Sequence, residues 1–208
     1  MTTDLLDSKS RKALKTVGKI DDNINSYQEL ISINHFFEII GSDPKFSSPG
    51  LLKELNEADL NYRYLKKEEK EKLYSEIKIT IESGKLSKSG PEKLKIWEMG
   101  WGENLSNFIN SKDFNSLKPK FVRDGLVKRL KGEYIIPRNP EFESVFFSLI
   151  RRAVYEKYFS SCDSIYEFGA GTGHNLIAFR KFDSNKKLIG TDWSEKAVSL
   201  MQELNKID

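Results

Sequence analysis

The sequence predicts an α/β fold, with a mainly helical region over residues 1–140 followed by the start of a parallel sheet over residues 141–208. Two observations carry this prediction. Apolar residues recur at helical spacing in parts of the first region. Residues 164–205 then alternate strand, helix, strand and helix with short connections, an order typical of a right-handed βαβ unit.

Length and charge bound the classes of protein to which the chain can belong. Its 208 residues suit one large domain or two small ones. The 34 basic and 31 acidic residues give a formal net charge of +3, which does not by itself favour nucleic acid as a partner. No run of about 18 apolar residues occurs, so neither a membrane-spanning helix nor a membrane partner is expected.

Cysteine and histidine usage limits the metal and redox chemistry. The single cysteine, Cys162, excludes an internal disulfide and a Cys-based zinc site. Two histidines, His35 and His174, are too few for a His-rich metal centre. Because the first residues also lack the apolar segment of a secretory signal, we expect a cytoplasmic protein without a metal site.

The first region contains five recognisable segments. Apolar spacing predicts helices at 26–40 and 66–83, and a loop rich in Gly, Pro and Ser separates them at 41–50. The aromatic, glycine-bearing stretch 96–108 is predicted to be a packed connector or a short helix. The residues EYII at 133–136, just before a proline, are predicted to form a short strand or an extended entry to the next element.

The C-terminal region has the clearest periodicity. A helix is predicted over 141–159 because its apolar residues fall on one face. The elements predicted after it are a strand at 164–168, a helix at 174–181, a strand at 187–191 and a helix at 194–205. Ser194 is a favourable N-cap for the last of these helices.

The turn after the first of these strands carries the strongest functional signal. It reads Glu167-Phe168-Gly169-Ala170-Gly171-Thr172-Gly173-His174. Its three glycines allow tight-turn dihedral angles and a close approach of a ligand to the backbone. Asp192 ends the second strand, where an acid can accept hydrogen bonds from the hydroxyls of a ribose. The pattern predicts a nucleoside-containing cofactor across the carboxyl ends of two adjacent parallel strands.

The spacing of these residues distinguishes between cofactors. A dinucleotide fingerprint, G-x-G-x-x-G, needs a glycine at the position that His174 occupies. Glu167, two residues before the first glycine, would repel a diphosphate but attract the ammonium of an amino acid. The turn therefore favours S-adenosylmethionine (SAM) as the cofactor.

The segments YEFGAGTGHN and KLIGTDWSEKAV resemble motif I and the following acidic strand end of class I SAM-dependent methyltransferases. The resemblance covers about 45 residues and implies a Rossmann-like sheet. It implies that Glu167 faces the methionine amino group, directly or through water. It further implies that Asp192 binds the ribose, that Trp193 flanks the adenine and that His174 reaches the carboxylate. The loop under the sulfonium and the carboxylate would consist of Gly169, Ala170, Gly171 and Gly173.

The same resemblance implies a seven-stranded sheet, of which residues 1–208 supply two strands. We therefore expect the N-terminal part of a longer enzyme, or one half of a split enzyme whose second chain supplies the later strands. The acceptor-facing motif of the family falls outside this sequence, so no catalytic residue is assigned. The lid-like helical region and the near-neutral charge favour a small-molecule acceptor such as a sugar or another metabolite.

Three alternatives stay open on the sequence. An RNA methyltransferase would use the basic stretch 118–131. A non-catalytic partner subunit of a split methyltransferase and an NAD-binding oxidoreductase are the other two. Trp97 and Trp101 fit either core packing or the lining of an acceptor pocket, and Arg138 is a weaker candidate for contact with an anionic group.

Overall fold

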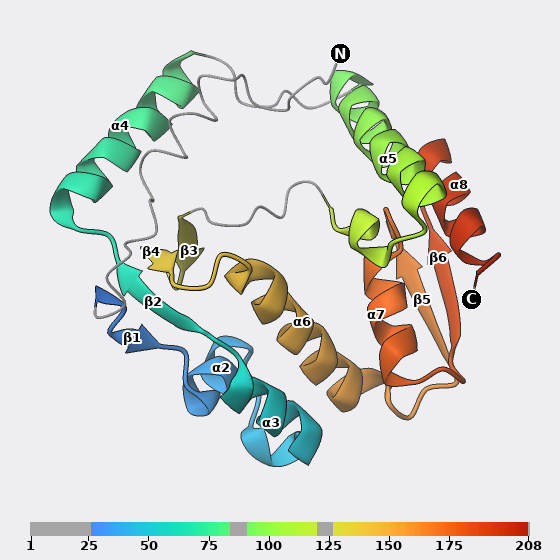
Figure 1. Cartoon of the computed structure of the whole chain (residues 1–208), viewed down its shortest axis with the longest axis horizontal. Helices are drawn as coiled ribbons and strands as arrows, with labels where there is room; N and C mark the ends of the chain where they lie inside the picture. Colours follow the sequence, from blue (N-terminus) through green and yellow to red (C-terminus); the bar gives the residue numbers. More distant parts are fainter. Residues whose placement is uncertain (1–25, 84–90, 120–126, 208) are drawn as a thin grey trace. The chain divides into compact units, whose positions relative to one another are not determined.

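The computed structural model describes residues 26–83, 91–119 and 127–207 and has a mixed α/β fold (Figure 1). The chain divides into two compact units. Unit 1 consists of Met1–Lys88 and Arg123–Leu149, and unit 2 consists of Ser89–Val122 and Ile150–Asp208. This division differs from the single boundary near residue 140 suggested by the sequence, since it groups residues 89–122 with the C-terminal segment.

Unit 1 contains a four-stranded antiparallel sheet in the order β1-β2-β4-β3. Its strands are β1 (Glu29–Leu30), β2 (Asn61–Tyr64), β3 (Lys128–Leu130) and β4 (Glu133–Pro137). Lys131 and Gly132, which join β3 to β4, both have positive φ angles, of 47° and 87°. Two successive left-handed residues are what a type I′ hairpin turn requires.

The helices of unit 1 only partly follow the sequence predictions. They are α2 (Ile33–Ile39), α3 (Pro49–Glu57) and α4 (Lys67–Glu82), with a 3₁₀ turn at Pro44–Phe46, and the first part of α6 (Phe142–Val154) also belongs to this unit. The predicted helix over 26–40 is wrong in its first half, because Glu29 and Leu30 pair with β2. The predicted loop over 41–50 ends two residues early, because α3 begins at Pro49. The helix at 66–83 and the strand at 133–136 agree with α4 and β4.

The expectation of a mainly helical N-terminal region missed the antiparallel sheet. Its strands are short, and in β2, which reads NYRY, the neighbouring residues Tyr62 and Arg63 are both buried, so burial does not alternate along the strand. Side chains from both strands and helices are nevertheless buried here, with Tyr62, Phe36, Phe37, Leu51 and Ile135 almost wholly inaccessible to solvent. Long-range pairing and burial, rather than local pattern, therefore hold these strands.

Unit 2 is built around a parallel strand pair, β5 (Ser164–Phe168) and β6 (Lys187–Thr191). Both strands have the predicted bounds. The helices of this unit are α5 (Pro91–Ser111), the end of α6 (Phe142–Val154) with a π-helical turn at Tyr155–Phe159, α7 (His174–Phe182) and α8 (Glu195–Leu204). Helix α5 lies along α8 (Figure 1).

The prediction of a connector or short helix at 96–108 was wrong in extent, because α5 runs through 21 residues. Gly100 and Gly102 lie inside α5 without ending it. Phe108 of α5 packs with Leu200 and Leu204 of α8, all of them buried. This apolar contact stabilises the helix and offsets the low helix propensity of the two glycines.

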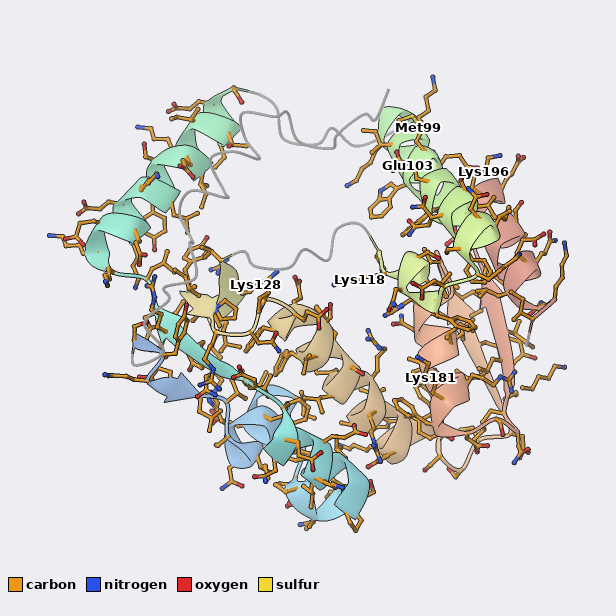
Figure 2. The ribbon with its side chains drawn as sticks, viewed as in Figure 1. Met99, Glu103, Lys118, Lys128, Lys181 and Lys196 are labelled. Atoms are coloured by element: carbon orange, nitrogen blue, oxygen red, sulfur yellow. The ribbon has the colours of Figure 1, made fainter. Side chains whose placement is uncertain are left out.

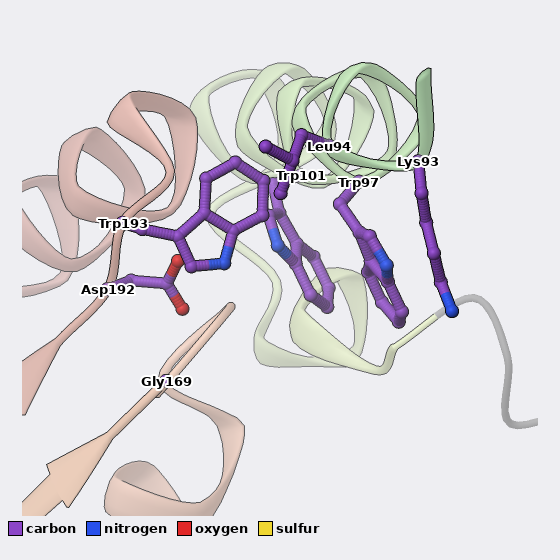
Figure 3. Close-up of a pocket in the computed structure, with 7 residues that line it drawn as sticks. All are labelled: Lys93, Leu94, Trp97, Trp101, Gly169, Asp192 and Trp193. Atoms are coloured by element: carbon purple, nitrogen blue, oxygen red, sulfur yellow. The ribbon is translucent and has the colours of Figure 1, made fainter. Parts of the chain in front are cut away.

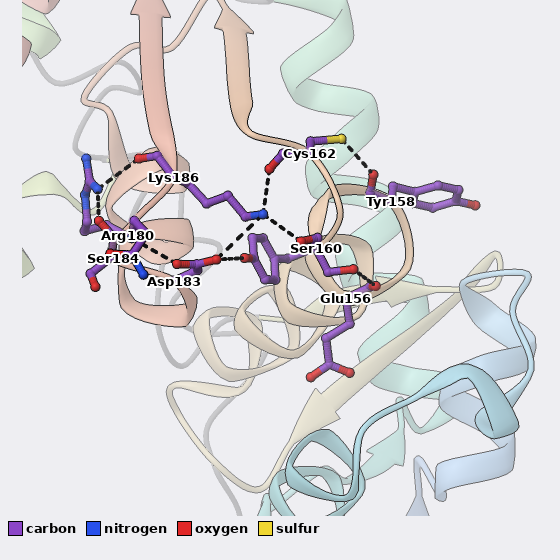
Figure 4. A network of polar contacts seen from close by, with 10 residues as sticks. Glu156, Tyr158, Ser160, Cys162, Arg180, Asp183, Ser184 and Lys186 are labelled. Carbon is purple, nitrogen blue, oxygen red and sulfur yellow. Dashed lines mark hydrogen bonds and ion pairs between the residues drawn. The ribbon is translucent and has the colours of Figure 1, made fainter.

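A polar network fixes the amino ends of β5 and β6 (Figure 4). The Lys186 ammonium donates to the carbonyl oxygens of Ser160 and Cys162, at 2.6 Å each. It also lies 3.6 Å from the Asp183 carboxylate, which accepts a hydrogen bond from the Tyr155 hydroxyl at 3.2 Å. These contacts join the segment before β5 to the loop before β6, at the end of the strand pair opposite the glycine turn.

Candidate functional site

The turn between β5 and α7 curls back onto the carboxyl end of β6. The backbone N–H groups of Gly169 and Ala170 both donate to the carbonyl oxygen of Thr191, at 2.8 and 3.0 Å. Gly169, Gly171 and Gly173 have φ angles of 71°, 55° and 71°. Because L side chains rarely adopt this left-handed region, the repeated glycines are what allow the turn to form.

The three glycines face different surroundings. A Cβ at Gly169 would meet no atom within 4 Å, so this backbone faces open space. A Cβ at Gly171 would lie 3.1 Å from the ring of Trp101, and one at Gly173 would lie 3.2 Å from the Leu204 side chain. Gly169 thus leaves room for a ligand, whereas the other two let α5 and α8 pack closely on the turn.

Asp192 joins the turn after β6 to the turn after β5. Its Oδ2 accepts a hydrogen bond from the backbone N–H of Gly171 at 2.8 Å, and its Oδ1 accepts one from that of Ser194 at 2.9 Å. Ser194 in turn caps α8, since its hydroxyl accepts from the Ala197 N–H at 3.1 Å. A carboxylate has about four lone-pair sites, so Asp192 keeps capacity for two further donors.

A cavity of about 450 Å³ lies at the carboxyl ends of the strands (Figure 3). The residues that line it are Lys93, Leu94, Trp97, Trp101, Gly169, Asp192 and Trp193. The rings of Trp97 and Trp101 are 5.3 Å apart with planes inclined by 32°. Trp193 is 55% exposed. Aromatic walls with a few polar groups at the ends are typical of small-molecule sites.

Glu167 belongs to β5, two residues before Gly169, and does not line this cavity. Its Oε1 accepts a hydrogen bond from the Asn175 side-chain amide at 2.7 Å. Its Oε2 is buried and has no hydrogen-bond partner within the described part of the chain. Burial raises the pKa of Glu167 above its usual value, although the Asn175 hydrogen bond and the charge of Arg151 act in the opposite direction. An unpartnered buried carboxylate oxygen is costly unless a donor reaches it.

His174 is the first residue of α7, and its ring is neutral at neutral pH. Burial and, to a lesser extent, the positive charges of Arg151, Lys181 and Lys118 together lower its pKa to about 4. Figure 2 labels two of these cations, Lys118 and Lys181. The ring therefore offers a hydrogen bond rather than a positive charge to any anion bound at this turn. The backbone N–H groups at the start of α7 keep the positive end of the helix dipole.

Three of the predicted site residues, Gly169, Asp192 and Trp193, line the cavity together. The others do not line it. Ala170 is buried, and Gly171 and Gly173 are packed against α5 and α8. Sequence reasoning gave no role to Thr172, which is buried and donates from its hydroxyl to the Leu117 carbonyl at 2.7 Å.

Helix α5 supplies the wall that the motif did not predict. Trp97 and Trp101, whose sequence fits either core packing or the lining of a pocket, both line the cavity. Lys93 and Leu94 join them and were not predicted. The sequence does contain a signal for this wall: Lys93, Trp97 and Trp101 are spaced by four residues, and residues at i, i+4 and i+8 share one face of a helix.

The remaining flagged residues have structural partners. In unit 1, Arg138 pairs with Asp59 at 2.8 Å. In unit 2, the Cys162 thiol donates to the Tyr158 carbonyl at 3.6 Å. Within the basic stretch 118–131, residues 120–126 lie outside the described part of the chain, while Lys128 and Lys131 pair with Glu143 and Glu38.

Comparisons with family models, curated proteins and solved structures found no match. Over residues 26–83, 91–119 and 127–207, no group of three His, Cys, Asp or Glu side chains is arranged to hold a metal ion. In the same residues, no helix combines the length and the apolar character that crossing a membrane requires. Support for a function therefore comes from the residues of the site itself.

Proposed function

We propose that this chain binds S-adenosylmethionine at the glycine turn and takes part in methyl transfer to a small molecule. One observation carries the proposal: Gly169 and Asp192, at the carboxyl ends of adjacent parallel strands, line the same cavity. Ligands of open parallel sheets bind at this edge. The Rossmann-like methyltransferase fold that the motif resembles is part of the same proposal.

The adenosine part fits the cavity end formed by Asp192 and Trp193. The carboxylate of Asp192 holds two backbone donors and has lone pairs left for two ribose hydroxyls. The half-exposed Trp193 indole offers a flat apolar surface for an adenine. Gly169 lets the backbone approach the ligand, since no side chain projects into the space beside it.

The amino-acid part is supported by Glu167. Its buried Oε2 has no partner in the described residues, and an ammonium donating to it would remove that cost. Asn175 holds the other oxygen and so fixes the orientation of the carboxylate. A diphosphate at the turn would face the carboxylate of Glu167, which disfavours a dinucleotide.

When bound, SAM supplies an electrophilic methyl group on a sulfonium. The contribution of the chain is then to hold this group and the acceptor in line and to exclude water, which are the main sources of acceleration for such a displacement. The Trp101 ring, held against Gly171, covers the turn from the side of α5. Lys93 and Asp192 are the ionisable side chains in the cavity wall of the described structure, and Asp192 is engaged by two backbone N–H groups.

A second polypeptide that packs on the sheet is the further candidate partner. On β5, Tyr166 is 58% exposed and Phe168 is 85% exposed. Parallel strands are ordinarily covered on both faces, so two large exposed side chains on one face favour an additional covering segment. A role as one subunit of a split methyltransferase remains part of the proposal on this ground.

Calorimetric titration tests the proposal. The whole chain is titrated with SAM and, separately, with NAD⁺; Asp192→Ala is the test variant. Asp163→Ala is the matched control, because Asp163 is an exposed aspartate at the opposite end of the strands. We expect SAM to bind, with affinity lowered about tenfold or more by Asp192→Ala, a loss of about 1.4 kcal/mol, and unchanged by the control. A folded chain that binds NAD⁺ and ignores SAM would overturn the proposal.

A further inference from the structure

The face of α5 that lines the cavity is longer than an adenosine bound at Asp192 would cover. It contributes Lys93, Leu94, Trp97 and Trp101 to the wall. Figure 3 shows the indoles in a row from Trp193 through Trp101 to Trp97, with the Lys93 ammonium beyond Trp97. The wall therefore continues past the ribose-binding end into a second aromatic surface.

This second surface is held in place. The Trp101 ring is seated against Gly171, where a Cβ would come within 3.1 Å of it. Glu98, on the same helix, accepts a hydrogen bond from the backbone N–H of Lys196 at the start of α8, at 3.0 Å. Trp97 packs on Trp101 with ring centroids 5.3 Å apart. The tilted ring pair is therefore fixed relative to the carboxyl end of β6, as a preorganised binding surface should be.

The two ends of the cavity carry opposite charge. Asp192 is the acidic end, and Lys93 is the basic end. Between them the wall is apolar, and Leu94 remains 48% exposed at the cavity. A flat aromatic ligand would bury apolar surface against such a wall and stack on it. An anionic group carried by that ligand would find an oppositely charged partner only at Lys93.

We propose that the Trp97–Leu94–Lys93 wall is the acceptor subsite and that it takes a flat aromatic molecule carrying an anionic group. The ring lies against Trp97 and the anionic group faces Lys93, which leaves a hydroxyl or amine of the acceptor toward Gly169. This inference rests on the proposed function. Methyl transfer to such an acceptor forms a bond from an oxygen or nitrogen lone pair to the methyl carbon. The carbon–sulfur bond breaks with its electron pair left on sulfur, and the acceptor proton passes to water.

Three probes separate ring shape from charge. The whole chain is saturated with S-adenosylhomocysteine, which has no methyl group to transfer, and titrated with 2-naphthoate. The comparators are 2-naphthylmethylamine, which has the same rings and a positive charge, and cyclohexanecarboxylate, which has the same charge and a saturated ring. We expect 2-naphthoate to bind alongside the saturating ligand and about tenfold more tightly than either comparator.

Variants assign the contact. Lys93→Gln is expected to weaken 2-naphthoate about five- to tenfold, and Lys93→Glu is expected to make the amine the preferred probe. Trp97→Leu is expected to weaken both naphthyl probes alike. Lys95→Gln, which removes an exposed lysine of the same helix that does not line the cavity, should change nothing. Circular dichroism of each variant confirms that the chain is folded.

The outcomes distinguish this inference from the function on which it rests. Binding of S-adenosylhomocysteine without binding of 2-naphthoate overturns the acceptor subsite and leaves the cofactor site intact. Displacement of S-adenosylhomocysteine by 2-naphthoate also overturns it, because the wall then belongs to the cofactor. Lys93-dependent binding of 2-naphthoate to a folded chain that ignores S-adenosylhomocysteine and SAM overturns the proposed function but supports the aromatic, anion-binding surface.

Discussion

Asp192 accepts a hydrogen bond from the backbone N–H of Gly171 at 2.8 Å, and this contact couples the two turns that form the candidate site. The acid that ends β6 thereby orients the glycine turn that follows β5. Asp192 has a structural role even before any ligand binds. A variant at this position must therefore be read together with the stability of the chain, and Asp192→Asn, which keeps one acceptor oxygen, is the milder change.

Alanine at two glycines separates backbone strain from crowding. Gly169→Ala places a left-handed φ of 71° on an L residue but meets open space, so we expect a loss of about 1–2 kcal/mol in unfolding free energy. Gly171→Ala adds a clash with Trp101 at 3.1 Å, which we expect to cost about 1 kcal/mol more. Urea unfolding followed by tryptophan fluorescence measures both. Equal losses with an unshifted emission maximum would contradict the close contact between Gly171 and Trp101.

Glu167→Gln is expected to separate stability from binding. Because burial raises the pKa of Glu167 in the folded chain, the folded state binds its proton more tightly than the unfolded state does. Ionisation of this carboxylate therefore lowers the stability of the folded chain as the pH rises above the ordinary pKa of a glutamate. Glutamine does not ionise, so it removes this cost, and its side-chain oxygen can still accept the hydrogen bond from Asn175.

Unfolding curves at pH 4 and pH 7 check this prediction. The variant should match the wild type at pH 4 and equal or exceed it at pH 7, yet bind SAM about tenfold more weakly. A variant that is less stable at pH 7 and binds SAM normally would show that Glu167 is a structural partner of Arg151 and Asn175 only.

The lowered pKa of His174 leads us to expect that the folded chain loses stability in mild acid. Its pKa is lowered from 6.5 to about 4 in the folded chain, so between these values the unfolded state binds more protons. Stability contributed by the neutral ring is present above pH 6.5 and is lost as the pH falls toward 4. We expect this loss to be about 1–2 kcal/mol after solvent screening. His174→Gln should show a correspondingly smaller fall between pH 6.5 and 4 by chemical denaturation; parallel curves for the two chains would exclude the effect.

Lys186 is expected to stabilise unit 2 through its two carbonyl partners. Lys186→Met keeps the apolar stem but removes the donors to Ser160 and Cys162, and we expect a loss of about 1–3 kcal/mol. Lys187→Met is the matched control, because Lys187 is the next residue along the chain and is exposed at the start of β6. Thermal and urea unfolding of both variants give the comparison. A loss of the same size in the control would argue against the network.

Local pattern was sufficient for the elements around the glycine turn. β5 and β6 have the bounds predicted, and α8 begins after Ser194, whose hydroxyl caps it as expected. Apolar periodicity and capping are local signals, so a single sequence contains them. The strands of unit 1 depend instead on pairing between segments far apart in the chain, such as β2 with β4, and no local pattern reveals that pairing.

The site was predictable in part for the same reason. Gly169, Asp192 and Trp193 follow from the strand ends and lie together at the cavity. The contribution of α5 was not predictable, because it requires knowing that this helix packs on α8 and against Gly171. The glycine-bearing stretch 96–108 was also predicted to be no more than a connector or a short helix, whereas packing keeps α5 helical through Gly100 and Gly102.

The pairing of Asp192 with a ribose hydroxyl is the central claim, and a cycle of binding measurements tests it most directly. S-adenosylhomocysteine and its 2′-deoxyribose analogue are titrated by calorimetry into the wild-type chain and into Asp192→Ala. We predict that loss of the hydroxyl weakens binding to the wild type about tenfold, or about 1.4 kcal/mol, and leaves binding to the variant almost unchanged. An equal loss in both chains would show that Asp192 does not contact the ribose and would contradict the account.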